Sequence, residues 1–138
     1  MESCIFCKII KGEIPSYKVY EDDYTLAFLD IRPVNTGHTL VISKDHFENI
    51  YTTPDESYAR LSLAVKKVAL AVKKALNSDG INIIMNNEKD AGQVIFHTHT
   101  HIIPRYKNDG LHGWPQKEYS KDEDVPTLVQ KITLELND

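Results

Sequence analysis

The sequence lacks several features that would place it in a specialised class of protein. Its 138 residues contain no apolar run near the ~20 residues that a membrane-spanning helix needs. The first residues lack the basic start and long apolar stretch of a secretory signal. With 16 basic and 20 acidic residues the net charge is −4, so no basic surplus indicates a nucleic-acid-binding surface. We therefore expect a cytoplasmic protein with neither a membrane nor a nucleic-acid partner.

Cysteine is also scarce. The two cysteines, Cys4 and Cys7, stand three positions apart, so a long-range disulfide is not expected, and the cytosol would keep both thiols reduced. Such a Cys-x-x-Cys pair is either half of a metal site or a redox pair. The hydrophobic content of 41% is enough for a core without any disulfide.

Hydrophobic periodicity predicts one α+β domain over residues 1–138. Strands are expected at residues 17–20, 24–30, 38–43, 81–85 and 94–103, and helices at residues 4–10, 54–76 and 126–136. For the long helix, Thr53 is the expected cap, Pro54 the first helical residue, and Glu56 the partner that completes a capping box. Short connections around one inserted long helix indicate an antiparallel sheet.

Histidine is the residue present at unusual density. Half of the six histidines fall in five residues, where His97, His99 and His101 alternate with Thr98 and Thr100. On a strand, this alternation places the three imidazoles on one face and both threonines on the core face. The residues alone leave three interpretations: hydrogen-bonded core histidines, a metal site, or a nucleophilic imidazole with helpers on either side.

This run resembles the histidine triad (HIT) family, whose pattern is His-φ-His-φ-His-φ-φ with φ apolar. Here threonine occupies both inner φ positions. The similarity extends over residues 3–115, and it is specific to the small Hint-like branch that carries a Cys-x-x-Cys pair. It includes Ile5-Phe6, residues 27–31, Gly37-His38, Asn86, Gly92-Gln93 and Trp114. The resemblance implies a HIT-like fold, with one long and one or two shorter helices on a five-stranded sheet, and sheets joined across a homodimer. Residues 116–138 would be an extension.

The resemblance further implies a hydrolase or transferase that acts on the α-phosphorus of purine nucleoside phosphoramidates or adenylated compounds. His99 would be the nucleophile that forms a covalent nucleotidyl-histidine, His101 would contact the phosphate or leaving group, and Gln93 would bring its amide near the phosphoryl oxygens. The implied nucleotide pocket comprises Ile5, Phe6, Phe28, Asp30, Ile31, Asn86, Gly92, Gln93, Val94, His99 and His101. The alternatives are an asymmetric dinucleoside polyphosphate hydrolase and a nucleotide-binding regulatory protein with weak catalysis.

The same resemblance implies a structural zinc ion bound by Cys4, Cys7, His46 and His97, while the chemistry itself requires no catalytic metal. The alternative is that both cysteines are ordinary helix residues and His46 a surface histidine. Trp114 is either a contact to the partner subunit's substrate or a packed aromatic side chain. We expect His38 simply to begin a strand.

Overall fold

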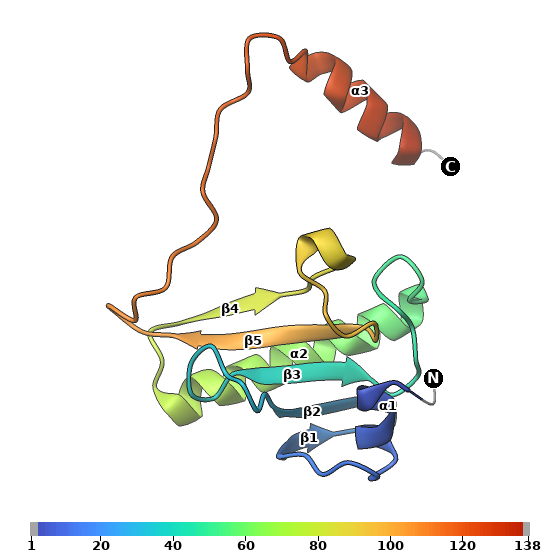
Figure 1. The fold of residues 1–138 in the computed structure, drawn as a ribbon, viewed down its shortest axis with the longest axis vertical. Coiled ribbons are helices and arrows are strands. Elements are labelled where there is room, and N and C mark those ends of the chain that lie inside the picture. The colour runs from blue at the N-terminus through green and yellow to red at the C-terminus, as the bar shows by residue number, and fades with distance from the viewer. Residues whose placement is uncertain (1–2, 137–138) are drawn as a thin grey trace.

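The protein folds as one five-stranded antiparallel sheet with a long helix across one face (Figure 1). The computed structural model describes residues 3–136. The elements in chain order are α1 (Ile5–Ile10), β1 (Lys18–Glu21), β2 (Thr25–Leu29), β3 (Thr39–Ser43), α2 (Asp55–Leu76), β4 (Gly80–Ile84), a 3₁₀ turn (Lys89–Ala91), β5 (His99–Arg105) and α3 (Val125–Leu136). The sheet order is β1-β2-β3-β5-β4, with every pair antiparallel. The predicted α+β fold is confirmed. Among these residues no helix is long and apolar enough to cross a membrane.

The two faces of the sheet have different roles. On one face the central strands pack their alternate side chains, such as Ala27, Val41 and Ile102, against the apolar stripe of α2. The opposite face carries Leu26, Phe28, Leu40 and Ile42, which pack against Phe6 of α1. Because successive residues of a strand alternate between faces, His99 and His101 fall on the α1 face and Ile102 on the α2 face.

The start of α2 differs from the prediction. Pro54 is the residue before the helix, and no side chain caps the first turn. The hydroxyl of Thr53 is used instead in the core, where it bonds the Thr98 hydroxyl at 2.8 Å and a backbone carbonyl at 2.7 Å. The predicted capping box is therefore wrong. Asp55 and Glu56 supply negative charge to the first turn, where it complements the helix dipole.

β5 begins later than predicted. The expected strand starts at residue 94, but the backbone groups just before His99 form hydrogen bonds with partners outside the sheet. The N–H of Thr98 donates to the carbonyl of Phe47 at 2.7 Å, and the carbonyl of His97 accepts from the His99 ring at 2.6 Å. Val94 in this segment is 82% exposed, whereas Thr98 is buried as predicted.

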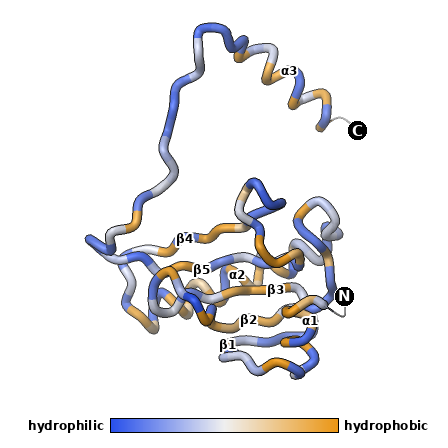
Figure 2. Tube along the Cα trace, viewed as in Figure 1, coloured by the Kyte–Doolittle hydropathy of each residue, from blue (hydrophilic) through white to orange (hydrophobic). Residues whose placement is uncertain are grey.

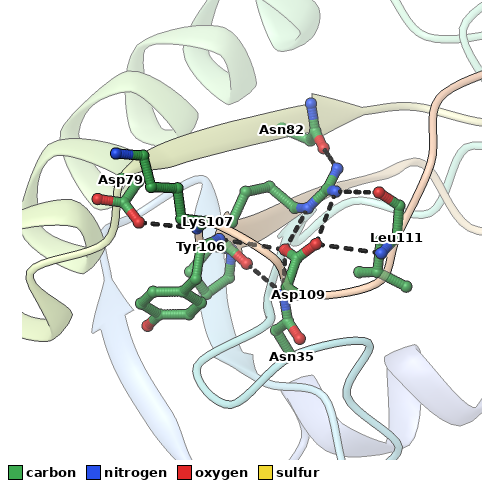
Figure 3. Close-up of polar contacts among 9 residues, drawn as sticks. Asn35, Asp79, Asn82, Tyr106, Lys107, Asp109 and Leu111 are labelled. Atoms are coloured by element: carbon green, nitrogen blue, oxygen red, sulfur yellow. Dashed lines mark hydrogen bonds and ion pairs between the residues drawn. The ribbon is translucent and has the colours of Figure 1, made fainter.

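Beyond β5 the chain leaves the domain as an extended arm that ends in α3 (Figure 1). The start of the arm is anchored by Asp109, which accepts hydrogen bonds from the Arg105 guanidinium, the Asn35 amide and the Leu111 N–H at 2.8–3.1 Å (Figure 3). The predicted C-terminal helix is confirmed. No residue of α3 is buried, and apolar and polar residues alternate along it (Figure 2).

Candidate active site and metal cluster

A cavity of about 460 Å³ lies on the α1 face of the sheet, within the range typical of small-molecule sites. One wall is apolar and comes from α1 and β2, and the other end carries His99 and His101 from β5. Ten of the eleven residues predicted to form a nucleotide pocket line it: Ile5, Phe6, Phe28, Asp30, Ile31, Asn86, Gly92, Val94, His99 and His101.

Eight lining residues were not predicted: Ile9, Ile14, Pro15, Ser16, Leu29, Arg32, Leu40 and Ile95. A signal existed for two of them. Ile9 follows Ile5 by four residues, one turn of a helix, and Leu40 of β3 lies two positions after His38, the residue that precedes the strand. The others lie in loops or at element ends, where no periodicity indicates which way a side chain points.

Gln93 is the predicted pocket residue that does not line the cavity. Its side chain is almost fully buried and is bonded to the main chain of its own loop and of the segment after β3. The amide nitrogen donates to the carbonyls of Glu48 at 2.6 Å and Ile95 at 3.1 Å, and the amide oxygen accepts from the N–H of Glu88 at 2.8 Å. These bonds shape the loop between β4 and β5 and tie it to the segment after β3. A contact between the Gln93 amide and a phosphate stays a prediction.

His99 is held in one tautomer by the main chain. Its Nδ1 lies 2.6 Å from the carbonyl oxygen of His97, and because a carbonyl only accepts, Nδ1 carries the proton. Nε2 of His99 is then the unprotonated nitrogen. Burial lowers the pKa of His99 below its ordinary value, against the opposing effects of the His97 carbonyl and Asp30. The ring is therefore neutral at pH 7, the state in which an imidazole is nucleophilic.

His101 is oriented by a neighbour that the sequence did not single out. The N–H of Val34 donates to Nδ1 of His38 at 3.1 Å, so the proton of the neutral His38 ring sits on Nε2. That Nε2 lies 2.9 Å from Nδ1 of His101 and donates to it. The remaining proton of the neutral His101 ring is then on its own Nε2, so a hydrogen-bond donor is available beside His99, whose ring centroid is 5.1 Å away.

Both rings of this pair are neutral near pH 7. Burial, followed by the nearby His99 and His38, lowers the pKa of His101 to about 4. Burial also lowers the pKa of His38, partly offset by the carboxylate of Asp30. Asp30, His38 and His101 lie close enough together to be considered as metal ligands, but the two imidazoles already share a hydrogen bond.

A second cluster lies at the start of α1, where Cys4, Cys7, His46 and His97 place one potential ligand atom each within 4.8 Å of the others. The Cys7 Sγ lies 3.4 Å from Nδ1 of His46 and 3.6 Å from Nδ1 of His97, and the Cys4 Sγ lies 3.4 Å from the latter nitrogen. The two Nδ1 atoms are 3.2 Å apart. All four predicted metal ligands therefore come together.

The spacing of these atoms fits one tetrahedral ion. Zinc–ligand distances near 2.3 Å for sulfur and 2.0–2.1 Å for nitrogen separate S and N ligands by roughly 3.5 Å and two N ligands by roughly 3.3 Å. The Nε2 of His97 donates to the carbonyl of Ser43 at 2.6 Å, which leaves its Nδ1 unprotonated and pointed at the thiols. The cluster could hold a metal ion with two sulfur and two nitrogen ligands.

With this geometry in place, comparison with known proteins identifies the family. The sequence profile of the HIT domain matches residues 11–108. The chain belongs to the HIT family. This HIT protein is 49% identical to Protein hit of Bacillus subtilis over 139 residues, which cover 98% of this chain and 95% of that protein.

Two relatives carry names that state an activity. The adenosine 5'-monophosphoramidase hnt1 of Schizosaccharomyces pombe is 45% identical and matches over 95% of this chain and 96% of its own length. The adenylylsulfatase HINT3 of Arabidopsis thaliana is 48% identical over 78% of this chain and 55% of its own length. The family membership and these names agree with a hydrolase of adenosine nucleotides.

Solved structures show the same fold. SMU.412c of Streptococcus mutans superposes with a TM-score of 0.93 at 43% identity, over 99% of this chain and 87% of that chain. A histidine triad family protein of Mycobacterium smegmatis superposes with a TM-score of 0.77 at 40% identity, over 85% of each chain, and is described as zinc-bound.

Proposed function

We propose that this HIT protein hydrolyses purine nucleoside phosphoramidates or related adenylated compounds through a covalent nucleotidyl-His99. The observation that carries the proposal is the tautomer of His99: a proton fixed on Nδ1 by the His97 carbonyl and a lone pair on Nε2, in a residue that lines a nucleotide-sized cavity. The names of two relatives support an adenosine nucleotide as substrate.

In the first step Nε2 of His99 attacks the α-phosphorus, a nitrogen–phosphorus bond forms, and the bond to the leaving group breaks with its electron pair going to the leaving group. An amine leaving group also needs a proton. Nε2–H of His101 is the donor beside it, and His38 keeps that proton on the correct nitrogen. Water then attacks phosphorus and gives a proton to Nε2 of His101, which the first step left unprotonated. The nitrogen–phosphorus bond breaks with its electron pair returning to Nε2 of His99, and the nucleoside monophosphate is released. These proposed steps use imidazoles and no metal.

The nucleoside is proposed to bind with its base against the apolar wall and its ribose hydroxyls on Asp30. One carboxylate oxygen of Asp30 accepts the N–H of Arg32 at 2.8 Å, and the residue lines the cavity between the wall and the histidines. Gly92 has φ +96°, a conformation that favours glycine, and it lies next to Asn86 at the cavity. Val94 lies at the cavity and its backbone N–H remains available to phosphate.

Cys4, Cys7, His46 and His97 are proposed to bind a structural zinc ion. Two thiolates and two imidazoles are a donor set typical of closed structural zinc sites, and a zinc-bound relative supports the choice of metal. When bound, zinc supplies cross-links rather than chemistry. It would tie α1, which carries Phe6 of the cavity wall, to His97, two residues before the nucleophile.

A homodimer is proposed to form along β4. Within residues 3–136, no strand pairs with the outer edge of β4. Ile83 on this strand is 53% exposed, and Leu63 and Leu70 on α2 are 70% and 55% exposed. An open edge beside exposed apolar side chains is a site where a second sheet can add its own edge strand.

One side-by-side assay tests the enzymatic proposal. We expect turnover of adenosine 5'-phosphoramidate to exceed that of a diadenosine polyphosphate, and His99→Ala to abolish turnover while the protein still folds and binds AMP. A preference for the polyphosphate would favour the dinucleoside hydrolase. Full activity of the His99→Ala variant would exclude the covalent mechanism, and AMP binding without turnover in the unmutated protein would favour the regulatory role.

A further inference from the structure

Arg32 is a cation at the cavity that has no anionic partner in the described chain. The other two arginines each hold a carboxylate, Arg60 that of Glu56 at 2.7 Å and Arg105 that of Asp109 at 2.8 Å. Within residues 3–136, no ion pair or hydrogen bond involves the Arg32 guanidinium. Among the described residues that line the cavity, Arg32 is also the only lysine or arginine, and both histidines there are neutral near pH 7. The guanidinium is therefore available to an anionic group of a ligand.

The main chain around Arg32 is held in place, so the guanidinium stays at the cavity. The N–H of Arg32 donates to a carboxylate oxygen of Asp30 at 2.8 Å. The N–H of Asp30 donates to the carbonyl of His38 at 2.9 Å, which closes the loop between β2 and β3 (Figure 1). Pro33 follows directly and restricts the backbone of Arg32. The base of the side chain is thus fixed, while Arg32 as a whole is exposed to solvent.

Asp30 relates this cation to one part of the proposed nucleotide. One oxygen of Asp30 accepts the Arg32 N–H, and the other lies 3.7 Å from Nε2 of His38. In the binding mode proposed above, the ribose hydroxyls contact Asp30 and the α-phosphorus lies at His99. An anion carried by a ribose hydroxyl would therefore lie next to Arg32 and apart from the reacting phosphorus.

The chemistry of the two side chains suits a ribose with one free and one phosphorylated hydroxyl. A carboxylate accepts hydrogen bonds from a free ribose hydroxyl, and a nearby arginine accommodates a phosphate on the ribose, as in dinucleotide-binding sites. The guanidinium can give two parallel N–H bonds to phosphate oxygens. The negative charge of Asp30 opposes such a phosphate, and Arg32 offsets that charge. Since the net charge of the chain is −4, attraction of a second phosphate must come from this local contact.

We propose that the cavity accepts adenylyl compounds that carry a second phosphate on a ribose hydroxyl, and that Arg32 binds this phosphate. The inference rests on the proposed function and names a substrate class for it. With 3'-phosphoadenylyl sulfate, Nε2 of His99 attacks the α-phosphorus, and the bond to the sulfate oxygen breaks with its electron pair going to sulfate. Water then hydrolyses the nucleotidyl-His99 and gives adenosine 3',5'-bisphosphate. The second phosphate is bound and does not react.

The first test measures binding of three nucleotides by isothermal titration calorimetry. AMP is compared with adenosine 2',5'-bisphosphate and adenosine 3',5'-bisphosphate, and the two isomers show which hydroxyl lies at Arg32. We expect one bisphosphate to bind the unmutated protein at least as tightly as AMP. In Arg32→Gln, the preference for that bisphosphate over AMP should fall roughly tenfold or more, because a charged hydrogen bond is lost and Asp30 is no longer offset. Arg60→Gln removes a cation outside the cavity and should keep the preference.

The second test measures turnover, and it separates this inference from the proposed function. The phosphorylated adenylyl sulfate that matches the tighter bisphosphate should be hydrolysed, and Arg32→Gln should lower its kcat/KM roughly tenfold or more relative to that of adenylyl sulfate. If both bisphosphates bind tenfold more weakly than AMP, or if Arg32→Gln leaves both ratios unchanged, the inference is overturned. Hydrolysis of adenosine 5'-phosphoramidate would then leave the proposed function intact. An unmutated protein that neither binds AMP nor hydrolyses any of these substrates would overturn both.

Discussion

At the scale of single residues, His38 determines which nitrogen of His101 carries a proton. His38→Ala removes the N–H donor to His101, so the proton can move away from the leaving group. We expect kcat for adenosine 5'-phosphoramidate to fall by roughly 10²-fold, the lower end of general-acid effects. The fall should be much smaller for adenylyl sulfate, whose leaving group needs no proton.

Steady-state kinetics with both substrates measures this difference. His38→Gln keeps an N–H donor and should recover part of the activity, and His112→Ala, at an exposed histidine of the arm, is the control. Equal losses on the two substrates would show that His38 acts only on folding or binding. The sequence did not reveal this role because the partner of His38 lies 63 residues away, across the pairing of β3 with β5.

At the scale of elements, we expect α1 to depend on the proposed zinc ion. The helix has six residues, too few to be stable by itself, and His46 lies outside it on the loop after β3. Elemental analysis of protein purified without added metal should find about one zinc per chain. His46→Asn should lose it, lower Tm by roughly 5–10 °C, and weaken AMP binding through Phe6, whereas His112→Asn should do none of these. Metal-free protein with an unchanged Tm would exclude the zinc site.

Most elements were predictable, because their apolar residues recur at the periods of a helix or a strand. The predicted element boundaries are wrong where hydrogen bonds outside the regular element involve the backbone or side-chain groups that the element would use. The pattern of residues 94–98 predicts a strand. Instead the His97 carbonyl accepts from the ring of His99, and the Thr98 N–H donates to the carbonyl of Phe47, so neither group pairs within the sheet. The sequence predicts Thr53 as a helix cap, but its hydroxyl forms a buried hydrogen bond with the hydroxyl of Thr98. The pocket and the metal ligands were identified from the family resemblance, since periodicity alone does not assign roles to the histidines.

At the scale of the whole molecule, we expect stability to fall when the solution is acidified below about pH 6.5. Burial lowers the pKa of His101 to about 4 and also lowers that of His38. An unfolded histidine takes up its proton near pH 6.5. Between pH 4 and pH 6.5 the unfolded chain therefore binds more protons than the folded chain, and the free energy of unfolding rises with pH.

Urea denaturation at pH 7.5 and pH 5 measures this effect. The loss from His101 should be on the order of 1 kcal/mol between these two pH values, after allowance for its partial exposure to solvent. His101→Gln replaces the titrating ring, so the difference between the two pH values should shrink. An undiminished difference in that variant would assign the acid sensitivity to other groups.

Main-chain groups hold three of the imidazoles: the Val34 N–H on His38, the His97 carbonyl on His99 and the Ser43 carbonyl on His97. Peptide groups survive almost every amino-acid substitution. The cavity wall can therefore be exchanged residue by residue without changing which nitrogen of each ring is unprotonated. A site built in this way can acquire a new base preference or a new leaving group while its chemistry stays the same, which makes the fold a suitable starting point for enzymes of altered specificity.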